Sequence, residues 1–156
     1  MLTFERRNRA YFAEFITDRG DGFYTRFAEH LGALLAEQEN GDCACYVLVD
    51  ETQLVVGRFN LYELTRSTAV VGYRVAEHVA GRGVATAALR DLCRIARERH
   101  GLRTLRAAVS DRNRASQKVL ERVGFLACGR AEVGGRSGAL YELRLTGDAP
   151  RPRPPS

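Results

Sequence analysis

Hydrophobic side chains recur at helical spacing in two stretches near the start of the chain. In residues 4–16, and again in residues 24–39, the apolar positions stand three or four apart, so each stretch predicts an amphipathic helix. Gly20 and Gly22 lie between the two helices and separate them. The period then falls to two and β-branched residues become frequent, which predicts strands at residues 44–49, 54–64 and 68–75. The short turns between these strands predict an antiparallel meander.

Helical spacing returns at residues 84–100, and a shorter helix is predicted at residues 114–123. The segment between them, residues 104–109, reads as a buried strand. Because a helix connects it to the strand at 68–75, these two strands should run parallel. Two closing strands, at residues 125–133 and 139–145, are predicted around a glycine-rich hairpin loop at 134–138. This order predicts a mixed α/β (α+β) fold in which helices flank one mostly antiparallel sheet.

The composition is that of a globular protein. The chain has 156 residues, of which 45% are hydrophobic, so we expect one domain at residues 1–147 with a substantial core. Proline and arginine dominate residues 148–156, where we expect a disordered tail. The sequence has neither an apolar run of about 18 residues nor the apolar core of a signal peptide. We therefore expect a cytoplasmic protein that makes no contact with a membrane.

Cysteines and charge narrow the choice of ligand. The four cysteines do not form a zinc-binding pattern, so we expect reduced thiols and no metal. The net charge is +5, and Lys118 is the only lysine among the 24 basic residues. Such an excess attracts a phosphate-rich cofactor or RNA. Because no basic stretch is interleaved with aromatic residues, we favour the cofactor and expect no nucleic-acid partner, with RNA as the alternative.

A glycine-marked turn joins the strand at 68–75 to the helix that follows. Gly81 and Gly83 let the backbone approach a ligand, and the first N–H groups of the helix form an anion site. A P-loop would need a lysine at the start of the helix, which is absent. A dinucleotide fingerprint would need a third glycine or an alanine where Thr86 stands. The turn at residues 80–85 also resembles the acyl-CoA turn of the GNAT superfamily, Gln/Arg-x-x-Gly-x-Gly/Ala, with Ala80 where that motif has Gln or Arg.

A second motif, at residues 111–125, makes the interpretation more specific. Asn113 and Ser116 stand three apart, and the helix ends in Leu-Glu-x-x-Gly-Phe at residues 120–125. Together with the glycine turn, this motif resembles the GNAT superfamily of N-acetyltransferases, and in particular its RimJ/RimL branch, over about residues 45–145. The resemblance implies a central mixed sheet whose parallel strands, 68–75 and 104–109, splay apart to bind acyl-CoA. It also implies transfer of an acetyl group from acetyl-CoA to a primary amine by direct attack.

The resemblance also implies which residues bind the donor. The pyrophosphate would lie on the N–H groups at the start of the helix, and the pantetheine arm would pair with the edge of the strand that ends at Val75. A backbone N–H of Val75 or Ala76 would polarise the thioester carbonyl. Asn113 would contact the pantetheine amides, or would only cap the short helix. The implied donor-binding residues are Val75, Ala76, Gly81, Arg82, Gly83, Val84, Ala85, Thr86, Asn113 and Ser116.

Catalytic roles are less strongly indicated. Ser116 would donate a proton to the departing thiolate, and its alternative role is a hydroxyl at the start of a helix. Glu77 is a candidate base for the amine, and its alternative is a solvated turn carboxylate. Tyr141 faces either the core or the cleft, and we expect the core.

The acceptor is a primary amine, on a protein N-terminus or on a small molecule. Carboxylates at Glu14, Asp18 and Asp21 would favour a cationic acceptor if they border the cleft. A homodimer is one possible assembly. The family usually has a strand before its first helix, and this chain begins almost inside the helix. An alternative function is a CoA-binding module without catalysis, which the missing Gln or Arg at Ala80 and the lack of a clear base would explain.

Overall fold

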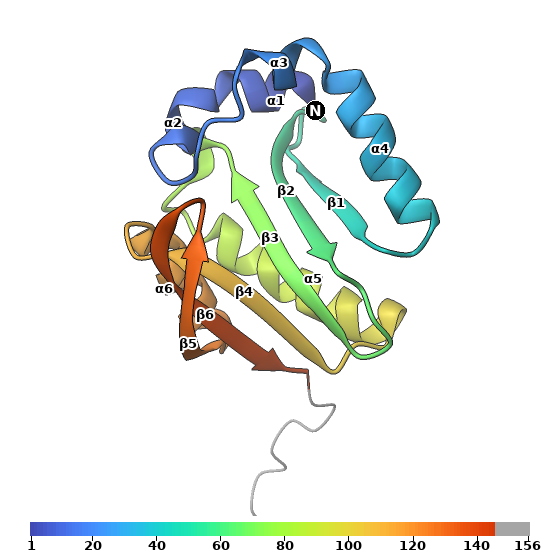
Figure 1. The fold of residues 1–156 in the computed structure, drawn as a ribbon, viewed down its shortest axis with the longest axis vertical. Coiled ribbons are helices and arrows are strands. Elements are labelled where there is room, and N and C mark those ends of the chain that lie inside the picture. Colours follow the sequence, from blue (N-terminus) through green and yellow to red (C-terminus); the bar gives the residue numbers. More distant parts are fainter. Residues whose placement is uncertain (146–156) are drawn as a thin grey trace, which may run out of the picture.

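The computed structural model describes residues 1–145, and the tail predicted at 148–156 lies outside the described residues. Six strands form one sheet in the order β1-β2-β3-β4-β6-β5 (Figure 1). The strands are β1 (Ala44–Val49), β2 (Val55–Tyr62), β3 (Thr68–Val75), β4 (Thr104–Ser110), β5 (Leu126–Val133) and β6 (Arg136–Arg144). The helices are α1 (Leu2–Arg7), α2 (Arg9–Ala13), α3 (Asp21–Thr25), α4 (Phe27–Glu39), α5 (Val84–His100) and α6 (Arg114–Val123), with a short 3-10 helix η1 (Glu77–Val79).

Each face of the sheet carries its own apolar cluster. On the face covered by α5, Leu89 and Leu92 of the helix pack in one cluster with Phe59 and Leu61 of β2. A smaller cluster, on the face covered by α1 and α2, joins Phe4, Phe12, Val56 and Ala76. Alternate residues of β2 and β3 thus contact opposite helical layers, which is why period-two patterning predicted these strands. No helix within residues 1–145 has the length and apolar composition needed to cross a bilayer.

The pair β3 and β4 is the parallel pair that the sequence predicts. The two strands are paired only from Thr68 to Val70, opposite residues 104–106. Beyond this point β4 pairs with β6 on its other side as far as Ser110, and β3 pairs with β2 as far as Val75. The facing edges of β3 and β4 are therefore unpaired and diverge, as Figure 1 shows. This confirms the predicted splayed pair.

The first predicted helix, at residues 4–16, is wrong as one element. It is two short helices that meet at Asn8, whose backbone leaves the helical region (φ −103°, ψ 7°). The Asn8 amide donates to the Phe4 carbonyl (2.9 Å) and accepts from the Glu77 N–H (3.0 Å). Hydrophobic spacing cannot show this break, because it is stabilised by a contact with a segment 69 residues away. The helix predicted at 24–39 is likewise divided, at Arg26.

The hairpin loop predicted at 134–138 is also wrong. The turn consists of two residues, Gly134 and Gly135, with φ of +57° and +75°, and β6 begins at Arg136. Positive φ at both positions matches the tight hairpin turn that fits the twist of the strands. Gly138 belongs to the strand, where a Cβ would lie 2.5 Å from the Val109 carbonyl oxygen. It is a glycine because β4 and β6 approach closely there, and this made the segment look like a loop.

Candidate active site

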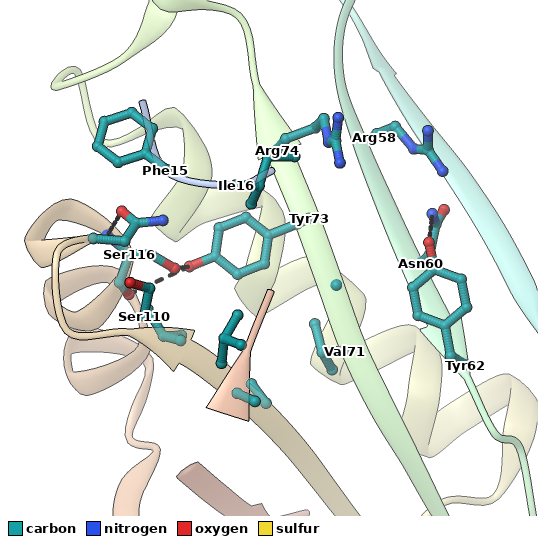
Figure 2. Close-up of a pocket in the computed structure, with 16 residues that line it drawn as sticks. Phe15, Ile16, Arg58, Asn60, Tyr62, Val71, Tyr73, Arg74, Ser110 and Ser116 are labelled. Carbon is teal, nitrogen blue, oxygen red and sulfur yellow. Dashed lines mark hydrogen bonds between the residues drawn. The ribbon is translucent and has the colours of Figure 1, made fainter. Parts of the chain in front are cut away.

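Two cavities meet at the gap between β3 and β4. The larger, of about 460 Å³, runs from the start of α5 to α6. The smaller, of about 240 Å³, lies beside the polar residues of β2 and is drawn in Figure 2. The residues that line both cavities are Phe15, Ile16, Tyr73, Arg74, Asn113 and Ser116. A ligand in one cavity can therefore reach a ligand in the other across these side chains.

The start of α5 is built to accept an anion. Gly81 and Gly83 have φ of +73° and +76°, and a Cβ at either position would meet nothing within 4 Å. Among residues 1–145, no side chain caps this helix, so its first N–H groups stay available to a ligand. The hydroxyl of Thr86 is buried and has no partner among the described residues. These groups suit a pyrophosphate. The turn predicted from the sequence, together with Val84 and Ala85, lies on the wall of the larger cavity.

Positive side chains complete this cavity on its far side. Lys118 and Arg122 of α6 both line it. Arg82, at the turn itself, is exposed and is not among the lining residues. The positive side chains on this far side of the larger cavity thus come from α6, while the glycine turn contributes backbone N–H groups. The turn motif alone did not reveal the contribution of α6.

The end of β3 distinguishes the two candidate N–H groups for the thioester carbonyl. The Ala76 N–H donates to the Val56 carbonyl (2.8 Å), and Ala76 is buried and lines neither cavity. Successive N–H groups along a strand point to opposite edges, so that of Val75 faces the unpaired edge. Val75 also lines the larger cavity. Of the two predicted residues, Val75 is the one placed to contact a donor.

Tyr73 is the functional candidate that sequence reasoning missed. Its hydroxyl oxygen lies 2.8 Å from Ser116 Oγ, at the junction of the cavities (Figure 2). The Tyr73 ring stacks on Phe59, with centroids 5.4 Å apart. Burial raises the pKa of Tyr73 to about 12, so its hydroxyl stays protonated at neutral pH. The signal in the sequence that could have identified it is a tyrosine near the end of a mainly apolar strand, just before a ligand-binding turn.

The two residues of the second motif lie together. Asn113 Oδ1 accepts from the Ser116 backbone N–H (3.1 Å), which confirms the predicted helix cap. The side chains of both residues also line both cavities. Tyr141 is only 5% exposed and belongs to the core, as expected.

Glu77 lies apart from these residues. It is exposed, in η1, and lines neither cavity. Within residues 1–145, no aspartate, glutamate or histidine lines either cavity. The geometry therefore gives the site hydroxyl groups and cations but no side chain suited to take a proton from an amine at neutral pH.

The acidic residues after α2 do not line the smaller cavity. Asp18 and Asp21 both bind Arg9, at 2.6 and 2.7 Å. The hydrogen bond from Arg9 lowers the pKa of Asp18 to about 2. The expectation that these carboxylates border the acceptor cleft is not met, because an arginine from α2 engages them outside it.

Instead, an ion triad forms part of the wall of the smaller cavity, with its two arginines lining the cavity and its carboxylate buried behind them. Arg58 and Arg74 stand opposite each other on β2 and β3. Both bind Glu5 of α1, at 2.6 and 3.2 Å, and the Glu5 side chain has no exposed surface. Figure 2 shows both arginines on the same side of the sheet as Asn60. Nothing in the sequence signalled this triad, since its members are 53 and 69 residues apart.

A comparison with protein families settles the family of this chain. The model of the acetyltransferase (GNAT) domain matches residues 4–126. The chain belongs to the GNAT acetyltransferase family. The match includes the glycine turn and the Asn113–Ser116 motif, so the resemblance stated from these residues is confirmed.

Relatives of this GNAT domain are similar over most of its length. The probable N-acetyltransferase YjcK of Bacillus subtilis (strain 168) is 27% identical over 150 residues, 90% of this chain and 81% of that protein. The ribosomal-protein-S5-alanine acetyltransferase of Vibrio fischeri has a TM-score of 0.84 at 22% identity, covering 96% of this chain and 88% of that one. RimJ of Mycobacterium smegmatis, in complex with CoA-disulfide, has a TM-score of 0.81 at 24% identity, covering 92% and 75%. These structures share the fold of this GNAT domain.

Membership of the family confirms three expectations. The GNAT domain is an acetyl-CoA-dependent N-acetyltransferase, its acyl donor is acetyl-CoA, and its sheet is the expected mixed one. Within residues 1–145, no three His, Cys, Asp or Glu side chains come together as a metal site.

Proposed function

We propose that the acetyl group passes from acetyl-CoA to a primary amine at the junction of the two cavities, beside Tyr73 and Ser116. The observation that carries this proposal is that the two cavities share this junction and extend from it along different elements, the smaller beside β2 and the larger to the start of α5. The donor occupies the larger cavity and the amine enters from the smaller one. Two substrates held in this way react as if within one molecule, which lowers the entropic part of the barrier.

The donor is held by groups of this chain at three points. The N–H groups at the start of α5, from Arg82 to Thr86, bind the pyrophosphate, and Lys118 and Arg122 add positive charge. The pantetheine arm lies in the gap along the unpaired edge of β3, and Asn113 contacts its amides. The Val75 N–H donates to the thioester carbonyl, where a well-placed donor contributes roughly 3 kcal/mol to the transition state.

The chemical step is a direct acyl transfer. The amine nitrogen attacks the carbonyl carbon, so a C–N bond forms while the C–S bond breaks. The sulfur leaves as a thiolate and takes a proton from the Tyr73 hydroxyl. Water then reprotonates Tyr73 through Ser116 Oγ, which lies 2.8 Å from the Tyr73 oxygen. The nitrogen releases its proton to water. The products are an amide and CoA with a free thiol.

The amine must be neutral before it attacks. Since no carboxylate or imidazole among the described residues lines the cavities, we propose that solvent accepts its first proton rather than Glu77. The acceptor itself is a primary amine of a small molecule or of a peptide N-terminus. The name of the Vibrio fischeri protein, a ribosomal-protein-S5-alanine acetyltransferase, supports an acceptor on a protein.

The experiment is to incubate the protein with acetyl-CoA and a panel of primary amines, measuring free CoA thiol and the acetylated product. Equal amounts of both products, formed only with an amine present, would support the proposal. Binding of acetyl-CoA, shown by a thermal shift, without turnover of any amine would instead support a CoA-binding module that does not catalyse transfer.

A further inference from the structure

The charge of the smaller cavity indicates which chemical group the acceptor carries besides its amine. Within residues 1–145, the charged side chains that line it are those of two arginines, Arg58 and Arg74, and no carboxylate lines it. Glu5 lies behind the wall and is fully buried, so it neutralises part of this charge without facing the cavity. The two arginines and Glu5 together carry one net positive charge.

The two arginines differ in how far the protein satisfies them. Arg58 donates to Glu5 through one terminal nitrogen. The other terminal nitrogen lies 3.0 Å from the Asn60 amide oxygen, in the orientation that also lets this oxygen accept from the Tyr62 hydroxyl. Burial lowers the pKa of Arg58, but the hydrogen bonds and charges of Glu5 and Tyr62 together outweigh this effect, so the pKa is raised. Arg58 is therefore a structural cation, held on both sides by its own chain.

Arg74 is held on one side only. Among the described residues, one of its nitrogens, Nη1, donates to a carboxylate, at 3.2 Å to Glu5. Its guanidinium carbon lies 4.9 Å from the centre of the Phe12 ring, which fixes the plane of the group. The side chain keeps 18% exposure and lines both cavities. The remaining nitrogens of this fixed fork are thus available to a ligand.

The electrostatics of Arg74 support the same conclusion. Burial lowers the pKa of Arg74 to about 10; Glu5 opposes this shift, and the charges of Arg19 and Arg58 add to it. Its cation is less stable here than in water, although it remains charged at neutral pH. A negative group bound from the cavity would supply the missing stabilisation.

We propose that the amine acceptor carries an oxyanion, a carboxylate or a phosphate, which Arg74 binds while the amine reaches the Tyr73–Ser116 junction. This inference rests on the proposed function and narrows its acceptor. A guanidinium fork matches an oxyanion with two parallel hydrogen bonds, which also orients the amine. A polyamine would place a second positive charge beside Arg74, so the same geometry rejects it.

The test compares acceptors that differ only in their anion. β-Alanine and γ-aminobutyrate are each paired with the corresponding amide, aminophosphonates of similar length form the phosphate arm, and spermidine is the cationic acceptor. Peptides that differ by Asp or Asn at the second position extend the test to N-termini. We expect kcat/KM to be at least about tenfold higher for the anionic member of a pair. Whether carboxylate or phosphonate is faster identifies the oxyanion.

Variants locate the effect. Arg74→Gln should bring the ratio within a pair to near one while leaving the KM for acetyl-CoA unchanged, and Arg74→Lys should give an intermediate ratio. Arg9→Gln removes one positive charge outside both cavities and should keep the ratio. Equal or faster turnover of the amides or of spermidine by the unmodified enzyme would overturn the inference without any variant, while leaving the proposed function intact. An absence of turnover with every amine would overturn both.

Discussion

The hydroxyl oxygens of Tyr73 and Ser116 lie 2.8 Å apart, although 43 residues separate them in the chain. Tyr73 comes from β3 and Ser116 from the first turn of α6. Their hydrogen bond spans the gap that opens where β3 and β4 stop pairing. Two hydroxyl groups are thus held where the two cavities meet.

Ser116→Ala should lower kcat by roughly tenfold and leave the KM for acetyl-CoA unchanged. In the proposed mechanism the hydroxyl returns a proton to Tyr73, whereas the cap of α6 uses the Ser116 backbone N–H and survives the substitution. Steady-state kinetics measure the effect. Ser137→Ala is the control, because Ser137 is exposed on β6 and lines neither cavity. A rise in the KM for acetyl-CoA with kcat unchanged would mean that Ser116 only binds the donor.

The pH profile should follow the amine rather than the enzyme. The reactive amine is neutral, so kcat/KM should rise with pH up to the pKa of each acceptor. Burial raises the pKa of Tyr73 to about 12, so its protonated form persists over the usual assay range and no falling limb from it is expected. Acceptors of different basicity are compared. A rising limb at one fixed pH for all of them would reveal an enzymatic base, with Glu77 the first candidate.

The main architecture could be predicted from the sequence because it depends on local patterns. Period-two alternation gave β1 and β3 with their observed bounds, and the capped apolar face gave α6. The glycine turn could be interpreted because its two glycines, Gly81 and Gly83, stand one residue apart at positions that have positive φ and open space. Such signals lie within a few residues of each other along the chain.

Arg82→Ala should raise the KM for acetyl-CoA several-fold with kcat unchanged. Its side chain stands at the glycine turn, where it can compensate for Ala80, the residue that replaces the usual Gln or Arg; loss of such uniform binding alters KM alone. Arg97→Ala, near the exposed end of α5, is the control. If the KM rises for Lys118→Ala but not for Arg82→Ala, the compensating charge comes from α6.

Glu5→Gln should destabilise the fold by about 3 kcal/mol, because it leaves two half-buried arginines without a counter-ion. The free energy of unfolding in urea measures this cost. Glu29→Gln, exposed in the first turn of α4, is the control and should change stability little. Equal stability of the two variants would show that water already screens Arg58 and Arg74.

The site was less predictable than the fold, since its parts meet only in three dimensions. The triad of Glu5, Arg58 and Arg74 joins a helix to two strands, and no spacing along the chain predicts it. In the sequence, Tyr73 resembles an ordinary strand residue. Its place at a candidate site becomes visible only in three dimensions, where β3 and β4 diverge and leave the edge of β3 unpaired. In the sequence Glu77 closely follows β3, but in the structure it belongs to η1 and its side chain is exposed.

Tyr73→Phe tests most directly the claim that transfer occurs at the Tyr73–Ser116 junction. The phenylalanine ring can still stack on Phe59, so binding of acetyl-CoA should persist while the proton donor is lost. We expect kcat to fall about 100-fold with an unchanged KM for acetyl-CoA. The control is Tyr46→Phe, which removes a hydroxyl bonded to His100 (2.7 Å) away from both cavities. Equal kcat values for Tyr73→Phe and the unmodified enzyme would contradict the account.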